Sequence, residues 1–224
     1  MKREIIKTGD GSTTIHMPEW NEQYHSKHGA IQEANHVFIE MGLKEVLERK
    51  DLDEISILEI GFGTGLNALV TWAAMQNKER KIHYTGVEAY PVEVEEVTQL
   101  NFAEEIKAEN SVAIFEKMHE TAWEDFHEIT DNFILKKQQK FFHEISDIDA
   151  FDLIYFDAFG ARVQPDLWTV EIFEKMYAAT KNNGVLVTYA AKGSVRRAML
   201  EVGFKVERLQ GPPGKREMLR ATKI

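Results

Sequence analysis

Short apolar runs alternate along the chain with longer segments in which apolar residues recur at helical spacing. Runs rich in β-branched and aromatic residues predict strands, and the periodic segments predict helices. The predicted strands are "ISILEI" (55–60), "KIHYTGVE" (81–88), "FDLIYF" (151–156) and "GVLVTYA" (184–190). Strands that alternate with helices indicate an α/β fold with a doubly wound, mostly parallel sheet.

Helical spacing predicts a first helix over about 31–49 and an apolar helix directly after the glycine turn at 61–65. Further helices are expected in "VEVEEVTQLNF" after Pro91, in "PDLWTVEIFEKMYAAT" up to "KNNG", and in "KGSVRRAMLEVG" up to Gly203. Two alternating runs around Gly211-Pro212-Pro213-Gly214 predict a C-terminal β-hairpin, which would make at least one edge of the sheet antiparallel.

The organisation elsewhere is less regular. The segment 106–145 has the weakest pattern, and "FILKKQQKFFHEI" (133–145) is consistent with one or two strands. No repeat or linker divides the chain, so we expect a single domain over 1–224, with 1–50 as an N-terminal extension of helix and loop.

Composition narrows the class of protein. The chain has 224 residues, enough for one sizeable core, and its 43% hydrophobic and 29% charged residues are ordinary for a globular protein. It has no cysteine, which excludes disulfides and thiol chemistry, and no apolar run approaches the roughly 18 residues of a membrane span. The N-terminus lacks the features of a signal peptide. We therefore expect a cytoplasmic enzyme without membrane contact or an obligate protein partner.

The net charge of −10 is unevenly distributed. Residues 192–224 hold nine Lys and Arg but only three acids, which gives this tail +6 and leaves −16 for the rest of the chain. A basic tail on an acidic body can hold phosphates while it discourages other polyanions. An equally open interpretation is that these charges are solvated faces of a helix and a hairpin.

A glycine turn and two acids form the first candidate site. Gly61, Gly63 and Gly65 follow the strand 55–60 directly, and Asn67 begins the next helix. Glycines suit a turn where a ligand approaches the backbone, and Glu88 at the end of the next strand can accept hydrogen bonds from ribose hydroxyls.

The sequence of the glycine turn differs from the motif that binds dinucleotides such as NAD, and this difference indicates which nucleotide binds. The turn reads G-x-G-x-G rather than G-x-G-x-x-G, and an acid, Glu59, stands just before it. An acid there fits a cationic or amino-acid-bearing ligand better than a pyrophosphate. S-adenosylmethionine has a sulfonium, an ammonium and a ribose but no phosphate, so we favour it over NAD. The terminal hairpin also resembles the sheets of class I S-adenosylmethionine-dependent methyltransferases, which end in this way.

Asp157 is the second candidate site, because it stands where the strand 151–156 ends. A carboxylate there can cap a turn, bind a metal or act on a substrate, and the carboxyl ends of parallel strands open onto the ligand crevice. The eight histidines form no H-x-x-x-H pair, so we expect no metal site.

Several stretches together resemble one family. These are "YHSKHGAIQEANHVFIEMGL", "LEIGFGTGLNALVTW", "FDLIYFDAFGARVQPDLWTVEIF" and "GSVRRAMLEVGFKVERLQGPPGKREML". They resemble the methyltransferase domain of the bifunctional tRNA 5-methylaminomethyl-2-thiouridine biosynthesis proteins, in its stand-alone form. The likeness covers most of 24–220 and is weaker over 105–145. It implies methyl transfer from S-adenosylmethionine to the primary amine of 5-aminomethyl(-2-thio)uridine at the tRNA wobble position.

The resemblance also implies roles for single residues. Asp157 would face the amine and either take its proton or orient it. Phe159 would stack on the uracil. Trp168 is a further substrate-binding candidate, but its place at a helix start favours packing. Tyr24, Ser26 and Glu33 would close over the cofactor or substrate, although Glu33 is equally consistent with an acid on a helix surface. Glu144 would lie near the adenine. Since the chain ends soon after the hairpin, we expect no oxidase domain and no FAD, with another enzyme supplying the amine.

Five basic residues are expected to contact tRNA phosphates near the anticodon, giving affinity that falls with salt. These are Lys192, Arg196, Arg197, Lys215 and Arg216. Two alternatives stay open from the sequence. One is a methyltransferase acting on an amine of a small molecule or a protein, and the other is a non-catalytic module that binds S-adenosylmethionine or RNA. A NAD-dependent reductase is a more distant third.

Overall fold

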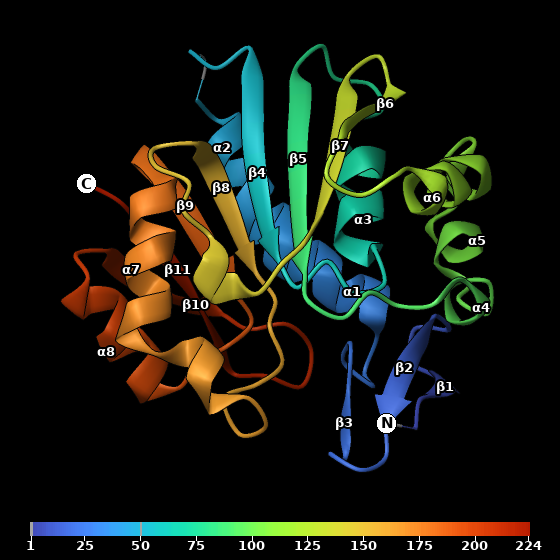
Figure 1. Cartoon of the computed structure of the whole chain (residues 1–224), viewed down its shortest axis with the longest axis horizontal. Helices are drawn as coiled ribbons and strands as arrows, with labels where there is room; N and C mark the ends of the chain where they lie inside the picture. Colours follow the sequence, from blue (N-terminus) through green and yellow to red (C-terminus); the bar gives the residue numbers. More distant parts are fainter. Residues whose placement is uncertain (1, 50) are drawn as a thin grey trace.

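The central feature is a sheet of eight strands, seen in a computed structural model that describes residues 2–49 and 51–224. Its strands are β4 (Glu54–Ile60), β5 (Lys81–Glu88), β6 (Phe126–Thr130), β7 (Phe133–Gln139), β8 (Phe151–Phe156), β9 (Thr180–Thr188), β10 (Lys205–Gln210) and β11 (Glu217–Thr222). They lie in the order β10-β11-β9-β8-β4-β5-β7-β6 (Figure 1). The five central strands are parallel, and β11, β10 and β6 are antiparallel to their neighbours. The predicted α/β fold with a C-terminal antiparallel hairpin is confirmed.

Helices cover both faces of this sheet because the strand side chains alternate. On β8, Leu153 and Tyr155 face one core, while Ile154 and Phe156 face the other. The first core includes residues of a continuous N-terminal helix, made of α1 (Ala30–Ala34), a π-helical stretch (Asn35–Leu43) and α2 (Lys44–Leu47), together with α3 (Leu66–Met75), α5 (Phe102–Ile106) and α6 (Ser111–Glu120). The second core includes α7 (Val170–Ala179) and α8 (Gly193–Glu201). The predicted helix over 31–49 is therefore a packed layer of the fold.

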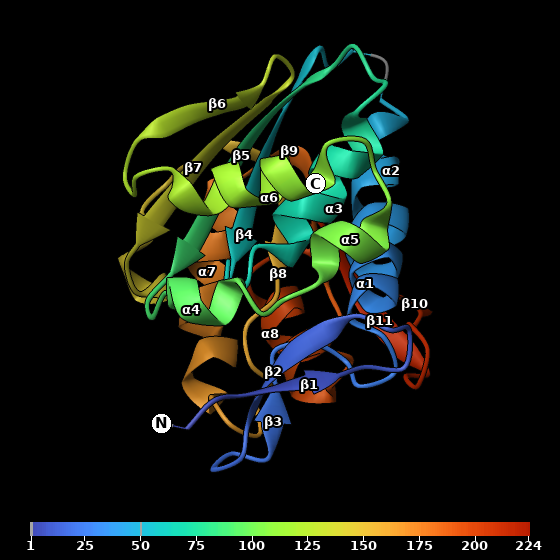
Figure 2. The ribbon, with the colours of Figure 1, turned by 90° about the vertical axis from the view of Figure 1, so that its right-hand side faces the viewer.

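The N-terminal segment differs from the expectation of helix and loop over 1–50, of which positions 1 and 50 lie outside the described residues. A small sheet of three antiparallel strands precedes the helix, namely β1 (Glu4–Lys7), β2 (Thr13–Met17) and β3 (Glu22–Gln23). Figure 2 shows it at the lower end of the molecule, apart from the central sheet. The expectation was wrong there because such short strands, of which β3 has only two residues, carry too little periodicity to be detected.

The predicted helix after Pro91 is also interrupted. The chain forms only α4 (Val94–Val97) before a break at Asn101, and α5 then starts a new direction. The Asn101 side chain accepts hydrogen bonds from the backbone N–H and hydroxyl of Thr13, at 2.7 and 3.0 Å. The helix is thus interrupted at the residue that contacts the N-terminal sheet. The local sequence pattern contains no sign of this contact.

Two other segments refine the predictions. The segment 133–145, for which one or two strands were expected, holds one strand, β7, followed by a short 3-10 turn, η2 (Phe142–Glu144). The rest of the irregular region 106–145 includes α6 and β6. The predicted helix over 165–180 is split into a 3-10 turn, η3 (Pro165–Trp168), and α7. Strand β9 begins directly after α7, so that "KNNG" lies inside the strand rather than in a loop.

Candidate active site

A cavity of about 970 Å³ opens at the carboxyl ends of β4, β5, β8 and β9. Residues at or just after the ends of these strands line it, among them Gly61, Glu88, Asp157 and Tyr189. The opposite wall comes from the N-terminal segment, including Trp20, Tyr24 and Ser26. The small N-terminal sheet therefore lies over the edge where the sheet's strand ends converge, which is the edge where ligands bind in such folds.

The glycine turn forms one wall and needs its glycines for two reasons. Gly61 and Gly63 have φ angles of +90° and +48°, in the region that side chains disfavour. A Cβ added to Gly61 would lie 2.8 Å from the carbonyl oxygen of Asp157, and one on Gly63 would lie 3.1 Å from the Tyr24 ring. The turn thus leaves bare backbone beside Asp157 and below Tyr24.

Two histidines hold the same turn in place. His25 Nε2 lies 3.3 Å from the Thr64 hydroxyl, and His119 Nε2 lies 3.1 Å from the Thr64 carbonyl oxygen. Burial lowers the pKa of each ring to about 4, so both are neutral near pH 7. The turn is therefore fixed both to the N-terminal segment and to α6, by residues that the sequence analysis did not identify.

Glu88 occupies the predicted position at the end of β5. Its carboxylate accepts hydrogen bonds from the backbone N–H groups of Gly63, at 3.0 Å, and Tyr90, at 2.9 Å. These bonds fix its orientation on the cavity wall, and burial raises its pKa. An anchored acceptor at this place suits the hydroxyl groups of a ribose.

Glu59 lies behind the wall instead of on it. Its side chain is fully buried, and its two oxygens accept hydrogen bonds from the Asn67 amide and the Tyr84 hydroxyl, both at 2.8 Å. Burial raises its pKa well above the usual value. The expected direct contact between Glu59 and a ligand is thus not observed among the cavity-lining residues, and Glu59 reaches the cavity only through Asn67.

Asn67 connects Glu59 to Asp157. Its Nδ2 also donates a hydrogen bond of 2.8 Å to Asp157 Oδ2, so one amide group bridges two carboxyl groups. The Asn67 side chain is buried, and its Oδ1 has no hydrogen-bond partner among the described residues. Asn67 therefore orients Asp157 from the first turn of α3.

Asp157 is a titratable group on the cavity wall whose pKa lies near neutral pH. It lines the cavity, and burial raises its pKa to about 7, against the lowering effect of the Asn67 hydrogen bond. The charge of Glu33 raises this pKa further, and the charge of Lys215 lowers it. A carboxyl group with a pKa near 7 can both accept and release a proton at neutral pH.

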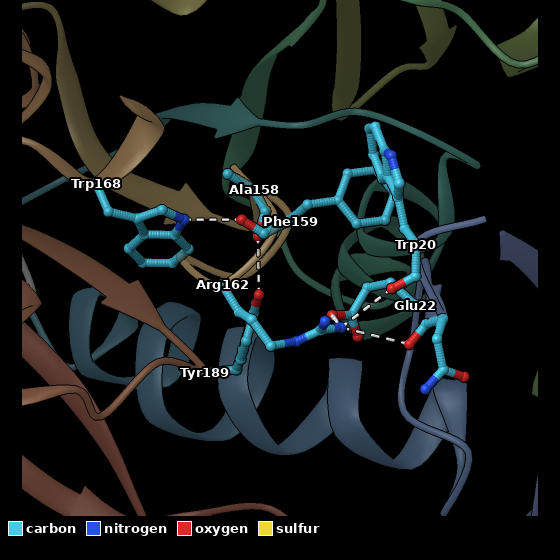
Figure 3. Close-up of polar contacts among 8 residues, drawn as sticks. Trp20, Glu22, Ala158, Phe159, Arg162, Trp168 and Tyr189 are labelled. Atoms are coloured by element: carbon cyan, nitrogen blue, oxygen red, sulfur yellow. Dashed lines mark hydrogen bonds and ion pairs between the residues drawn. The ribbon is translucent and has the colours of Figure 1, made fainter. Parts of the chain in front are cut away.

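Aromatic rings form the wall beyond Asp157. Phe159 packs edge-to-face against Trp20 and Tyr24, with ring centroids 5.7 and 5.0 Å apart, and all three rings line the cavity. Trp168 was a candidate for substrate contact for which packing was the favoured interpretation, and it is 5% exposed and does not line the cavity. Its indole Nε1 donates a hydrogen bond of 2.7 Å to the Phe159 carbonyl oxygen (Figure 3). Trp168 is thus a packing residue that positions Phe159.

The loop that carries Phe159 is tied to the N-terminal segment by Arg162. Its Nη2 donates to the carbonyl oxygens of Trp20 and Asn21 and to the Glu22 carboxylate, the last at 2.9 Å (Figure 3). Since Trp20 and Glu22 line the cavity, this arginine holds two walls of the cavity together. Neither Arg162 nor Trp20 was identified from the sequence, because their contact joins segments about 140 residues apart.

Ser26 and Glu33 reach the cavity as expected, together with Lys215. The Ser26 backbone N–H donates to Glu33 Oε2 at 3.0 Å, and Lys215 Nζ donates to Glu33 Oε1 at 2.6 Å. Lys215 Nζ also lies 3.9 Å from the centre of the Tyr189 ring. Lys215 was expected to contact phosphate, but here it is paired with a cavity acid.

Glu144 does not lie on the cavity wall. Its carboxylate accepts a hydrogen bond of 2.7 Å from the backbone N–H of Phe141, which caps the turn η2, and the side chain is exposed. The neighbouring Phe141 and Phe142 line the cavity in its place. The expected contact of Glu144 with the adenine is wrong for this arrangement, because the short turn uses the carboxylate locally.

Some basic residues of the segment 192–224 form ion pairs with acids of the protein, so fewer are available for phosphate than the composition suggested. Arg220 pairs with Glu45 and Glu207, and Lys223 pairs with Asp149. Four of the predicted phosphate contacts make no ion pair with another described residue and do not line the cavity: Lys192, Arg196, Arg197 and Arg216. Lys192 stands at the start of α8, three residues after Tyr189, and so lies at the same edge of the sheet as the cavity.

The groups on the cavity wall indicate which ligand the cavity fits. The bare glycine backbone permits close approach of a ligand, and the Glu88 carboxylate offers anchored acceptors for the hydroxyl groups of a ribose. S-adenosylmethionine carries such a ribose, and so it fits these residues. No group of three or more metal-ligating residues lies together within 2–49 and 51–224, and no helix there is long and apolar enough to cross a membrane.

Comparison with known proteins agrees with this geometry. Residues 101–224 match the family model described as S-adenosyl-L-methionine-dependent methyltransferase. The bifunctional tRNA 5-methylaminomethyl-2-thiouridine biosynthesis protein MnmC of Delftia acidovorans is 30% identical over 224 residues, and that of Burkholderia multivorans is 28% identical over 220 residues. The matches cover 93% and 92% of this chain, but the chain spans only a third of the length of these relatives.

A solved structure is also similar over nearly the whole chain. The crystal structure of MNMC2 from Aquifex aeolicus has a TM-score of 0.78 and 26% sequence identity. It covers 98% of this chain, which in turn covers 69% of that structure. Since the family model matches more than half of the residues, the chain belongs to the S-adenosyl-L-methionine-dependent methyltransferase family.

Proposed function

We propose that this protein transfers a methyl group from S-adenosylmethionine to the aminomethyl nitrogen of 5-aminomethyl(-2-thio)uridine at the wobble position of tRNA. The observation that carries the proposal is the Asp157 carboxylate on the cavity wall, beside the glycine turn of a methyltransferase fold. The names of the relatives, which describe biosynthesis of 5-methylaminomethyl-2-thiouridine in tRNA, support this choice of substrate.

The residues that would hold the cofactor are those of the glycine turn and Glu88. Gly61 and Gly63 give the ligand access to the backbone, and Glu88 offers anchored acceptors for its ribose. Asn67 would not hold the cofactor itself but would fix the orientation of Asp157 through its hydrogen bond. When bound, S-adenosylmethionine supplies an already activated methyl group, so the protein mainly has to position the acceptor.

The acceptor amine poses the chemical difficulty, because an alkylammonium has a pKa near 10.4 and has no lone pair when protonated. Asp157, with a pKa of about 7, is a stronger base than an ordinary aspartate and can accept a proton from the amine or orient it. Its carboxylate would align the nitrogen for attack, and the proton would leave to Asp157 or through it to water. The nitrogen gains the methyl group and loses one proton, while the S–CH3 bond breaks and the sulfonium leaves as a neutral thioether, S-adenosylhomocysteine, so atoms and charge balance.

The rest of the substrate would be held in two ways. Phe159 and Tyr24 offer aromatic faces and edges for a splayed-out uracil, as single-stranded bases are commonly bound. Lys192, Arg196, Arg197 and Arg216 would contact phosphates of the anticodon arm without reading sequence. Because the proposed substrate is tRNA, the proposal also predicts that the protein lies in the cytoplasm.

The test is nucleoside mass spectrometry on amine-bearing, under-methylated tRNA after incubation with the protein and S-adenosylmethionine. The expected result is a gain of one methyl group on the wobble uridine. No gain on tRNA would contradict the proposal. Methylation of a free amine but not of tRNA would favour a small-molecule methyltransferase, and binding of the cofactor without any transfer would indicate a non-catalytic module.

A further inference from the structure

An acid, a lysine and an aromatic ring meet beside Asp157 in a way that the reaction scheme does not yet use. We call the set formed by Glu33 and Tyr189 the Glu33 corner. The ammonium of Lys215 lies in it, 2.6 Å from Glu33 Oε1 and 3.9 Å from the centre of the Tyr189 ring. All three residues line the same cavity as Asp157.

Other contacts hold the Glu33 corner in place. The second carboxylate oxygen of Glu33 accepts the backbone N–H of Ser26, and the Glu33 side chain is only 12% exposed. The Tyr189 hydroxyl donates a hydrogen bond of 2.9 Å to the carbonyl oxygen of Ala158, the residue after Asp157. The ring and the carboxylate are therefore both fixed relative to the loop that carries Asp157.

A fixed carboxylate next to an aromatic face is a binding site for an alkylammonium group. In this structure the protein's own primary ammonium occupies it. Lys215 belongs to the tight turn between β10 and β11, so its side chain reaches the cavity from a surface hairpin and is 35% exposed. An ammonium group of a substrate would find the same two partners.

We propose that the Glu33 corner binds the protonated primary amine of the substrate next to Asp157, and that Lys215 occupies this corner until the substrate displaces it. The inference rests on the proposed function, which supplies a primary alkylamine as the acceptor. The bound ammonium then loses a proton to Asp157 before the nitrogen attacks the methyl carbon.

Charge explains why this exchange would select amines. Replacement of one primary ammonium by another leaves the charge of the cavity unchanged. A hydroxymethyl or carboxylate analogue that displaced Lys215 would leave Glu33 as an unpaired, nearly buried anion, which is strongly unfavourable. The corner therefore accepts 5-aminomethyl groups and rejects uncharged or anionic groups of the same size.

Steady-state kinetics on amine-bearing tRNA separates this role of Lys215 from the alternatives. Lys215→Met keeps an unbranched side chain and removes the competing cation, so KM should fall by about three- to tenfold with kcat retained. Arg216→Met is the matched variant on the same hairpin, and KM should rise for it if Arg216 contacts phosphate. A rise in KM or a loss of kcat for Lys215→Met would overturn the inference, since it would make Lys215 a phosphate contact or a catalytic group.

A binding measurement tests the corner without any turnover. In protein carrying isotope-labelled lysine, the side-chain NMR signal of Lys215, assigned with Lys215→Met, should move on titration with ethylammonium. Ethanol is the uncharged control, and Glu33→Gln should abolish the response. A Lys215 signal that ignores ethylammonium overturns the inference even if tRNA is methylated. If the signal moves while tRNA gains no methyl group, the corner stands and the proposed function fails.

Discussion

Asn67 Nδ2 donates a hydrogen bond of 2.8 Å to Asp157 Oδ2, joining the first turn of α3 to the end of β8. The same nitrogen donates to the buried Glu59, so Asp157 is oriented by a network that lies mostly behind the cavity wall. Asp157 would therefore contact the substrate, while Asn67 and Glu59 hold Asp157 in place.

Asp157→Asn should lower kcat for methyl transfer by about 100-fold or more, because the amide cannot accept the proton of the amine. The affinity for S-adenosylmethionine should stay close to that of the wild type, since Asp157 faces the acceptor amine, not the cofactor, in the proposed complex. Single-turnover kinetics and calorimetric titration of the cofactor measure the two quantities. A large loss of cofactor affinity would show that Asp157 belongs to the cofactor site.

The pH dependence of kcat/KM should report Asp157. Its pKa is raised to about 7, mainly by burial, so the carboxylate fraction and hence kcat/KM should rise through this pH. In the enzyme–substrate complex a neighbouring ammonium favours the carboxylate, so the inflection in kcat should lie lower. Asp157→Asn should remove this inflection and leave only the titration of the amine. A wild-type profile that is flat from pH 5.5 to 8 would contradict this role.

The same raised pKa predicts a pH-dependent difference in stability. Because the folded protein binds the Asp157 proton more tightly than the unfolded chain, the stabilisation is complete below the ordinary value of 3.8 and is lost as pH rises through about 7. Asp157→Asn, which cannot ionise, should therefore gain stability relative to the wild type on going from pH 5 to pH 8. Urea unfolding at both pH values measures this change, and an unchanged difference would argue against the raised pKa.

Glu59→Leu should destabilise the fold, because the Tyr84 hydroxyl and one Asn67 amide hydrogen would lose their acceptor in a buried site. Each unsatisfied group costs about 1–3 kcal/mol of unfolding free energy. Glu59→Gln is the matched control, since the Tyr84 hydroxyl can reverse its hydrogen bond, and it should lose about 1 kcal/mol or less. Equal losses for both variants would show that the carboxylate charge, rather than the hydrogen bonds, is required.

Gly61→Ala should disturb both stability and turnover. The added Cβ would lie 2.8 Å from the Asp157 carbonyl oxygen, at a φ angle of +90°, so the backbone beside Asp157 must move. We expect a loss of about 1–3 kcal/mol in unfolding free energy and a turnover reduced by about tenfold or more. Gly193→Ala is the control, because its Cβ would meet only the flexible end of Arg197, at 3.2 Å. Wild-type turnover in Gly61→Ala would show that the close packing of Gly61 against the Asp157 backbone is not required for activity.

The basic residues at α8 should determine how tRNA binding depends on salt. Replacement of Lys192, Arg196 and Arg197 by Met should weaken tRNA binding and reduce the slope of log K against log salt by about one per lost phosphate contact. Lys78→Met is the control, because Lys78 is exposed just before β5 starts, at the other edge of the sheet. A slope unchanged by the triple replacement would place the tRNA elsewhere.

Much of the candidate site could be predicted from single strands and the residues that follow them. Gly61, Glu88 and Asp157 each stand where an apolar run ends, and parallel strands bring such ends to one edge. Contacts between distant segments could not be predicted in this way. Trp168 and Glu144 carry the right chemistry at the right place in the chain, but one is turned into the core and the other caps its own turn.

The order of strands and helices, the glycine turn and the acids at the strand ends could be predicted from the residue pattern, because periodicity and strand polarity are local properties. Three contacts became visible only in the fold: the N-terminal sheet lies over the cavity, Asn67 bridges Glu59 and Asp157, and Lys215 pairs with Glu33 across 182 residues. These contacts depend on where packing brings distant segments together, and the composition of the basic tail does not show which of its charges are already neutralised by acids of the body.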